Sequence, residues 1–177
     1  MGKYKAQSSL HFYLHVYFFK LRDFFYPRVN ILKELKINSG FQVVDYGCGP
    51  GSYIVSLSRL TGENGKVFAV DSHPLAVKKV REIISRKGLN NVEAVCSDCE
   101  TGLSGNSIDI VLLYDVFHAL QNPDAVLVEL HRIIKPGGIL SFQDHRIEGK
   151  TIPDIFIKSR FRLLEKGQRA YSYQKIV

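Results

Sequence analysis

Val43-Val44-Asp45-Tyr46-Gly47-Cys48-Gly49-Pro50-Gly51 sets the pattern that the rest of this chain follows. Apolar residues lead into a loop with three glycines, and apolar side chains at helical spacing follow over residues 52–60. The pattern predicts a strand over residues 41–46, a tight turn at the glycines and then a helix. Glycines in such a turn let a ligand approach the backbone beside the amino end of the helix. We therefore expect a ligand site at this loop.

Strands and helices alternate along the chain beyond this loop. The patterns predict strands over residues 66–71, 92–97, 108–114 and 139–144, and helices over residues 74–87, 123–134 and 152–157. The strands are continuously apolar, which indicates a parallel sheet covered by helices on both faces. Segments 161–165 and 170–176, on either side of Gly167, predict an antiparallel hairpin. Such sheets bind ligands beyond the carboxyl ends of their strands.

Acidic residues stand at or after the ends of the first three predicted strands: Asp45, Asp71 and Asp98. A carboxylate at Asp45 repels a pyrophosphate and attracts a cation. The carboxylate of Asp71 suits a ribose diol, and Asp98 can accept a hydrogen bond from an exocyclic amine. The glycines also miss the spacing of a dinucleotide fingerprint. The ligand so described has a cationic end, a ribose and an aminopurine. S-adenosylmethionine fits this description, whereas NAD and ATP do not. Capping or surface roles for the three acids are the structural alternatives.

These segments together resemble the class I, Rossmann-like S-adenosylmethionine-dependent methyltransferases. Leu130-His131-Arg132-Ile133-Ile134-Lys135-Pro136-Gly137-Gly138 resembles the small-molecule branch related to quinone-biosynthesis C-methyltransferases. The resemblance extends from about Arg28 to Ile176. It implies an α/β fold with a doubly wound seven-stranded sheet of order 3-2-1-4-5-7-6, strand 7 antiparallel, plus N-terminal helices. It also implies S-adenosyl-L-methionine as methyl donor and S-adenosyl-L-homocysteine as product.

The resemblance assigns most of the cofactor-binding residues to the first loop and to the next three strand ends. It implies that Gly47, Gly49 and Gly51, with Cys48 between them, line the methionine part, and that Asp45 binds the ammonium. It implies that Asp71 binds the ribose hydroxyls, that Ser72 and His73 flank the adenine, and that Asp98 and the Cys99 amide bind the adenine edge. Tyr114 and Asp115 would lie beside the sulfonium and the acceptor. A capping role for His73 at the helix starting with Pro74 is the alternative.

Methyl transfer is an in-line displacement, and a general base is needed only where the acceptor loses a proton. Asp115 and His118 are the candidates we select for catalysis, and Asp144 and His145 are placed similarly after the fifth strand. Packing or capping is the alternative for each histidine. Tyr114-Asp115-Val116-Phe117 differs from the Asn/Asp-Pro-Pro-aromatic motif of enzymes that methylate nucleobase amines, which argues against such an acceptor.

Aromatic residues dominate the beginning of the chain, with eight between Phe12 and Tyr26. We expect a helix from about Ser9 to Asp23 and a second one starting at Pro27. Residues 1–36 are interpreted as an N-terminal helical lid over the site, and residues 37–177 as the Rossmann-like methyltransferase domain. Packing on the protein's own core or on a dimer partner, and contact with a membrane surface, are the alternatives for this helix.

Composition and charge limit the partners of this chain of 177 residues. Three cysteines, with a lone C-x-x-C at Cys96 and Cys99, predict no disulfide framework and no metal site, and they fit a cytoplasmic protein. We expect no transmembrane segment. Residues 1–36 carry seven Lys/Arg and two acids, residues 146–177 carry eight and three, and the middle carries nine and twelve. These basic ends keep nucleic acid open as a partner, although we do not expect it.

Three functions are compatible with these features of the sequence. The preferred one is a methyltransferase acting on a small molecule. A methyltransferase acting on RNA or protein is the second, and a non-catalytic S-adenosylmethionine-binding module is the third. A homodimer is a further expectation.

Overall fold

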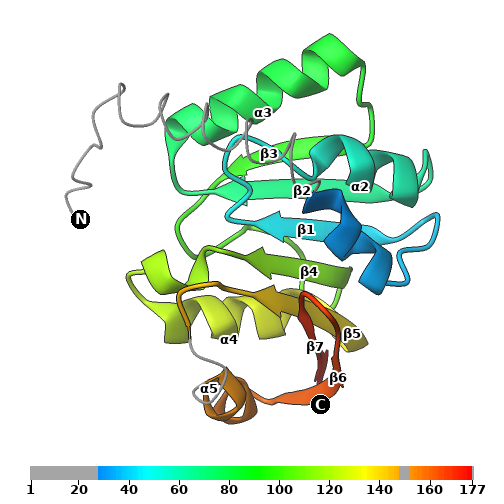
Figure 1. The fold of residues 1–177 in the computed structure, drawn as a ribbon. Coiled ribbons are helices and arrows are strands. Elements are labelled where there is room, and N and C mark those ends of the chain that lie inside the picture. The colour runs from blue at the N-terminus through cyan, green and yellow to red at the C-terminus, as the bar shows by residue number, and fades with distance from the viewer. Residues whose placement is uncertain (1–27, 148–151, 177) are drawn as a thin grey trace.

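The computed structural model describes residues 28–147 and 152–176, which form one seven-stranded sheet with helices on both faces (Figure 1). The strands are β1 (Gln42–Tyr46), β2 (Lys66–Asp71), β3 (Val92–Cys96), β4 (Ile108–Tyr114), β5 (Ile134–Gln143), β6 (Phe161–Lys166) and β7 (Tyr171–Lys175). The helices are η1 (Arg28–Glu34), α2 (Ile54–Thr61), α3 (Pro74–Lys87), η2 (Phe117–Ala119), α4 (Pro123–Ile133) and α5 (Ile152–Lys158).

The order of the strands in the sheet confirms the fold that the resemblance implies. The order is β3-β2-β1-β4-β5-β7-β6. Strands β1 to β5 run parallel to one another, and β7 runs antiparallel to both β5 and β6. The carboxyl ends of the first five strands therefore lie at one edge, where the predicted site residues are found.

Successive residues of the central strands pack on opposite faces of the sheet, which explains their continuous apolar sequence. In β4, Val111 and Leu113 pack with α4 and α5, whereas Ile110 and Leu112 pack with η1, α2 and α3. All four of these side chains are buried. The sheet therefore has two apolar layers and no exposed face at its centre.

Two predicted elements differ from the structure. The helix expected to start at Pro27 is the 3-10 helix η1, which begins at Arg28 among the described residues. Strand β5 begins at Ile134 rather than at residue 139, because Ile134 pairs with Ile108 and Ile139 pairs with Ile110. The Pro-Gly-Gly segment between these two pairs is thus a bulge within the strand and not a turn that precedes it.

Only residues 28–36 of the predicted lid segment lie within the described residues. Ile31 and Leu32 of η1 are buried in the same apolar layer as α2. The aromatic helix expected over residues 9–23 lies outside the described residues, so the lid stays a prediction.

Strand β6 forms one edge of the sheet, and after Phe161 all of its side chains are exposed. Leu163 and Leu164 are the large apolar ones among them.

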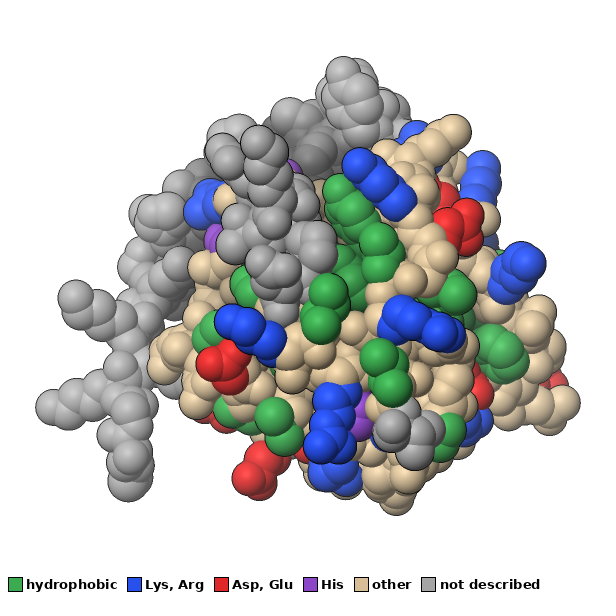
Figure 2. Space-filling model, turned by 90° about the horizontal axis from the view of Figure 1, so that it is seen from below, with side chains coloured by type: hydrophobic (Ala, Val, Ile, Leu, Met, Phe, Trp, Pro, Cys, Tyr) green, Lys and Arg blue, Asp and Glu red, His purple; other side chains and the backbone are tan. Residues whose placement is uncertain are grey.

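Figure 2 views the molecule from below, and hydrophobic side chains lie among lysine and arginine side chains on that face. None of the helices in residues 28–147 and 152–176 combines the length and apolar character that crossing a bilayer requires.

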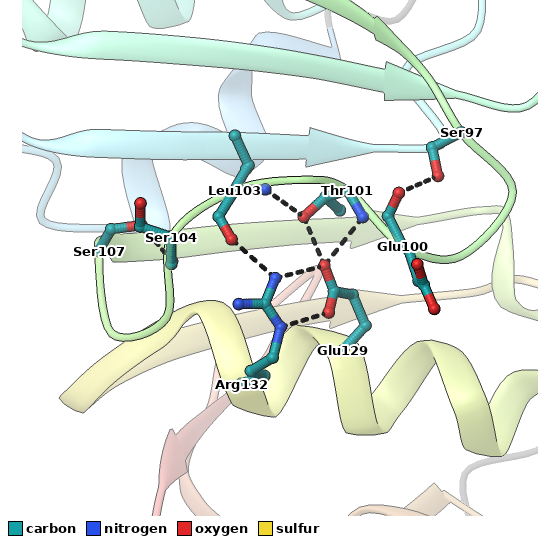
Figure 3. Close-up of polar contacts among 8 residues, drawn as sticks. All are labelled: Ser97, Glu100, Thr101, Leu103, Ser104, Ser107, Glu129 and Arg132. Carbon is teal, nitrogen blue, oxygen red and sulfur yellow. Dashed lines mark hydrogen bonds and ion pairs between the residues drawn. The ribbon is translucent and has the colours of Figure 1, made fainter.

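A buried carboxylate on α4 fixes the long loop between β3 and β4 (Figure 3). Glu129 accepts hydrogen bonds from the amide and the hydroxyl of Thr101, at 2.8 and 2.6 Å. Arg132 donates to the same carboxylate through Nε and Nη2, at 2.7 and 2.9 Å, and Nη2 also donates to the Leu103 carbonyl. Because Asp98 lies near the start of this loop, the cluster supports the edge of the candidate site.

We expect Glu129→Ala to lower the free energy of unfolding by about 1.5–3 kcal/mol, the usual contribution of charge-assisted hydrogen bonds. Burial alone would raise the pKa of Glu129, but the bonds from Arg132 and Thr101 together lower it. The carboxylate therefore stabilises the fold at neutral pH, and this contribution is lost as the pH falls through its lowered pKa. Urea denaturation at pH 7 and at pH 4 measures both effects. Glu100→Ala, a change in the same loop, is the control, and equal effects of the two changes would contradict the assignment.

Candidate functional site

The glycine loop after β1 lies between the end of β2 and the segment that follows β4, at the edge of the sheet where the parallel strands have their carboxyl ends. The amides of Gly47 and Cys48 donate to the Val70 carbonyl at 2.8 and 3.0 Å, which fixes the loop to β2. Gly47 has a φ of +76°, and a Cβ there would overlap the side chain of Val116, which follows β4. Only glycine satisfies both constraints, so the structure alone requires glycine at this position. Its contact with the cofactor stays a prediction.

Asp71 connects this loop to the start of α3. Its Oδ2 accepts from the Gly49 amide and its Oδ1 from the His73 amide, each at 2.8 Å. Burial raises the pKa of Asp71, and these two amide bonds oppose the shift. A carboxylate has about four lone-pair positions, so both oxygens can still accept from a ligand hydroxyl.

His73 caps helix α3. Its Nδ1 accepts from the Leu75 amide at 3.2 Å, and Pro74 occupies the first helical position. The capping role that sequence reasoning kept as an alternative is therefore confirmed. A contact of His73 with adenine stays a prediction.

Asp45 is a buried acid beneath the loop, with only 2% of its surface exposed. Its Oδ2 has no hydrogen-bond partner among the described residues. Burial, and then the nearby charge of Asp71, raise the pKa of Asp45 to about 7. A buried carboxylate oxygen without a partner is costly. A cationic N–H donor would satisfy this oxygen, and the ammonium of S-adenosylmethionine is such a donor.

Four residues predicted to bind the cofactor, Gly47, Asp71, Ser72 and Asp98, meet around one small cavity of about 50 Å³. Its other lining residues are Tyr46, Ser97, Val116 and Leu120. The Tyr46 hydroxyl donates to the Asp98 carbonyl at 3.1 Å, which joins β1 to the loop after β3. The structure therefore brings together residues that lie up to 51 positions apart in the sequence, from Gly47 to Asp98.

Three other predicted residues, Cys99, Cys48 and Tyr114, are not among the residues that line this cavity. The Cys99 amide donates to Ser97 Oγ at 3.3 Å, within its own loop. Cys48 is buried, and burial raises the pKa of its thiol. The Tyr114 hydroxyl lies 2.6 Å from Ser141 Oγ, and burial raises the pKa of this tyrosine well above its usual value. Tyr114 is therefore a neutral residue held in the core beside the loop.

Two histidine–aspartate pairs cross between the ends of β4 and β5. His118 follows β4, and its Nδ1 lies 2.9 Å from both carboxylate oxygens of Asp144, which follows β5. His145 follows β5, and its Nδ1 lies 2.7 Å from Oδ1 of Asp115, which follows β4. The two rings meet edge to face at 5.8 Å between centroids. Sequence reasoning selected these residues singly and missed the pairing, whose only signal is their common position after neighbouring strands.

Asp115, Asp144 and His145 also offer ligand atoms within 4.8 Å of one another, a spacing that suits a metal ion. The sequence predicts no metal site. In the structure each histidine Nδ1 lies at hydrogen-bond distance from a carboxylate oxygen, so in the absence of a cation each pair shares a proton. The expectation that no metal binds here stays a prediction.

We expect Asp45→Asn to stabilise the protein in the absence of ligand. The pKa of Asp45 is raised to about 7, so the stability of the parent is highest at low pH and falls as the pH rises through that value. Removing the charge removes this loss, which is about 4 kcal/mol above pH 8 for a shift of about three pKa units. Urea denaturation at pH 5.5 and pH 8.5 measures it, with the exposed Asp98→Asn as control. Parallel pH profiles for parent and variant would disprove the buried charge.

Comparisons with known proteins agree with this geometry. A family model described as a methyltransferase domain matches residues 37–174. A solved SAM-dependent methyltransferase from Aquifex aeolicus is 30% identical, with a TM-score of 0.71, covering 82% of this chain and 86% of that one.

Two curated relatives are named as methyltransferases. A demethylmenaquinone methyltransferase from Geobacillus stearothermophilus is 26% identical over 63% of this chain and 48% of its own length. A ubiquinone/menaquinone biosynthesis C-methyltransferase from Shewanella pealeana is 32% identical over 76% and 57%. The chain spans about half the length of the curated relatives it matches. The chain belongs to the S-adenosylmethionine-dependent methyltransferase domain family.

Proposed function

We propose that this chain transfers a methyl group from S-adenosylmethionine to a small molecule. The observation that carries the proposal is the buried Asp45 carboxylate, whose Oδ2 lacks a partner among the described residues beneath a glycine loop. When bound, S-adenosylmethionine supplies an electrophilic methyl group on a positively charged sulfur. The residues of the chain then have to bind that molecule, orient it and place an acceptor in line with the methyl group.

The carboxyl edge supplies a partner for each part of the cofactor. We assign the ammonium group to Asp45 and the ribose hydroxyls to Asp71. The remaining assignments follow the order of the loops: Gly47, Cys48, Gly49 and Gly51 at the methionine part, Ser72 and His73 beside the adenine, Asp98 and Cys99 at its edge, and Tyr114 beside the sulfonium. Of these assignments, that of Asp71 has the strongest support, because Asp71 already holds the loop on which the methionine part would lie.

The acceptor side is assigned to Asp115 and His118, which lie at the end of β4 next to the cavity-lining Val116. The names of two relatives refer to demethylmenaquinone and to ubiquinone or menaquinone biosynthesis, and this supports an acceptor with a quinone-type ring. A cytoplasmic location is part of the same proposal, supported by free cysteines at all three positions. The homodimer stays a prediction.

A macromolecular acceptor is the second candidate. The basic residues at both ends of the sequence, and the lysine and arginine side chains on the face in Figure 2, favour it. The departure from the nucleobase-amine motif at Tyr114–Phe117 counts against RNA bases.

We expect transfer of labelled methyl into the small-molecule fraction of a cell extract. The parent protein is incubated with methyl-labelled S-adenosylmethionine and extract, and the products are separated by size. Demethylmenaquinol is added in a parallel reaction as a defined probe. Label confined to RNA or protein would establish the second candidate, and no enzyme-dependent label in any fraction would refute methyl transfer.

We expect Asp71→Ala to weaken binding of S-adenosylhomocysteine by about 10- to 100-fold, the loss of one or two hydrogen bonds to a charged group. Asp71→Asn should weaken it less, because an amide oxygen still accepts one of the bonds. Calorimetric titration measures both, with thermal melts to show that the variants fold. An unchanged dissociation constant in folded Asp71→Ala would disprove the ribose assignment.

A further inference from the structure

The crossed His–Asp pairs determine where each imidazole carries its proton. Asp144 accepts from the His118 amide at 3.0 Å as well as from the ring Nδ1. Asp115 accepts from the His145 amide at 3.2 Å and from its Nδ1 at 2.7 Å. A carboxylate facing Nδ1 holds the proton on that nitrogen, so the neutral ring keeps Nε2 as a free acceptor. Both histidines are therefore prepared to take a proton at Nε2.

His118 is the better held of the two. Its partner Asp144 has a side chain that is 0% exposed, and Asp144 also accepts from the Arg146 amide at 3.0 Å. The His118 side chain is 21% exposed, whereas that of His145 is 59% exposed. A shielded, oriented imidazole is a stronger candidate for proton removal than one that solvent surrounds.

The position of His118 brings it to the border of the cofactor cavity. It lies on the short helix η2, and the residues that flank this helix, Val116 and Leu120, both line the cavity with Gly47 and Asp71. His145 packs edge-on against the His118 ring and restricts its rotation. The pair formed by His145 and Asp115 thus packs against the pair formed by His118 and Asp144.

We propose that His118 is the general base of the reaction and that Asp144 is its positioning residue. The acceptor is then a weakly acidic hydroxyl compound, such as a phenol or an enol. This proposal rests on the proposed function. His118 Nε2 takes the proton of the acceptor hydroxyl. The electron pair so released forms the bond from the acceptor oxygen, or from its conjugated ring carbon, to the methyl carbon. The bond from methyl carbon to sulfur breaks, and its electron pair neutralises the sulfonium. Where carbon is methylated, loss of its ring proton to water restores the aromatic ring. The imidazolium returns its proton to water.

Nitrogen NMR of the histidine rings tests the pair without needing to know the acceptor. The full-length protein is labelled with ¹⁵N, treated with chelator and saturated with S-adenosylhomocysteine. We expect His118 as the Nδ1–H tautomer with an unprotonated Nε2. Asp144→Asn should move the proton to Nε2, because the amide group can donate to Nδ1, whereas Asp124→Asn on the exposed start of α4 should change nothing. An Nε2–H tautomer in the parent, or no response to Asp144→Asn, would overturn the proposal.

The same sample tests the metal alternative. Loss of the His118 and His145 ring signals on addition of Mn²⁺ alone would show a cation among Asp115, Asp144 and His145, and would also overturn the proposal. Failure of S-adenosylhomocysteine to bind would contradict the proposed function instead, since the ring signals report on the pair independently.

Kinetics of the labelled transfer test the role of the base. His118→Ala should lower the rate of methyl transfer about 100-fold or more, the usual contribution of a general base, with unchanged affinity for S-adenosylhomocysteine. Imidazole added to the buffer should restore part of the rate in this variant. His131→Ala on α4, whose Nε2 bonds the Ile176 carbonyl, is the matched control and should keep the parental rate. A folded His118→Ala protein with full activity, or one that imidazole does not rescue, would show that His118 has only a structural role.

Discussion

The two amide bonds to Asp71 are the interaction on which the site depends. One oxygen holds the glycine loop after β1, and the other holds the first turn leading into α3. A single carboxylate thereby fixes the relative position of two loops that arise from different strands. The loop can lie this close to Val116 only because Gly47 has no side chain, since a Cβ at this position would overlap Val116. The β4 end is thus linked to the same centre.

This arrangement places two acids close together in a buried region. Asp71 is satisfied by amides, whereas Asp45 Oδ2 has no partner among the described residues and Asp45 has its pKa raised to about 7. The fold therefore holds an unfavourable negative charge where a cationic ligand would relieve it. A binding site that is less stable without its ligand is a common consequence of placing charged groups for function.

The sequence was sufficient to predict the strand ends but not the contacts between them. Asp45, Asp71 and Asp98 follow apolar runs, and the rule that ligands bind beyond parallel strands puts them at one edge. Local patterns could not show that Pro136–Gly138 bulges within β5, because the pairing of Ile134 with Ile108 is a contact between distant segments. They also could not show the Glu129 cluster, since Thr101 lies 28 residues from Glu129 in the sequence and contacts it only in the folded chain.

The crossed pairs follow from the register of β4 and β5. Tyr114 pairs with Gln143, so the next residues of both strands, Asp115 and Asp144, leave the sheet at the same level. Asp115 has a φ of +53°, and its amide donates to the Gln143 carbonyl at 2.7 Å. This turn extends the ladder by one bond and lets each aspartate reach the histidine from the neighbouring strand. Any shift of this register by one residue would separate both pairs, because it would turn the side chains to opposite faces. The chemistry of the acceptor side is therefore determined by strand pairing as much as by the four side chains.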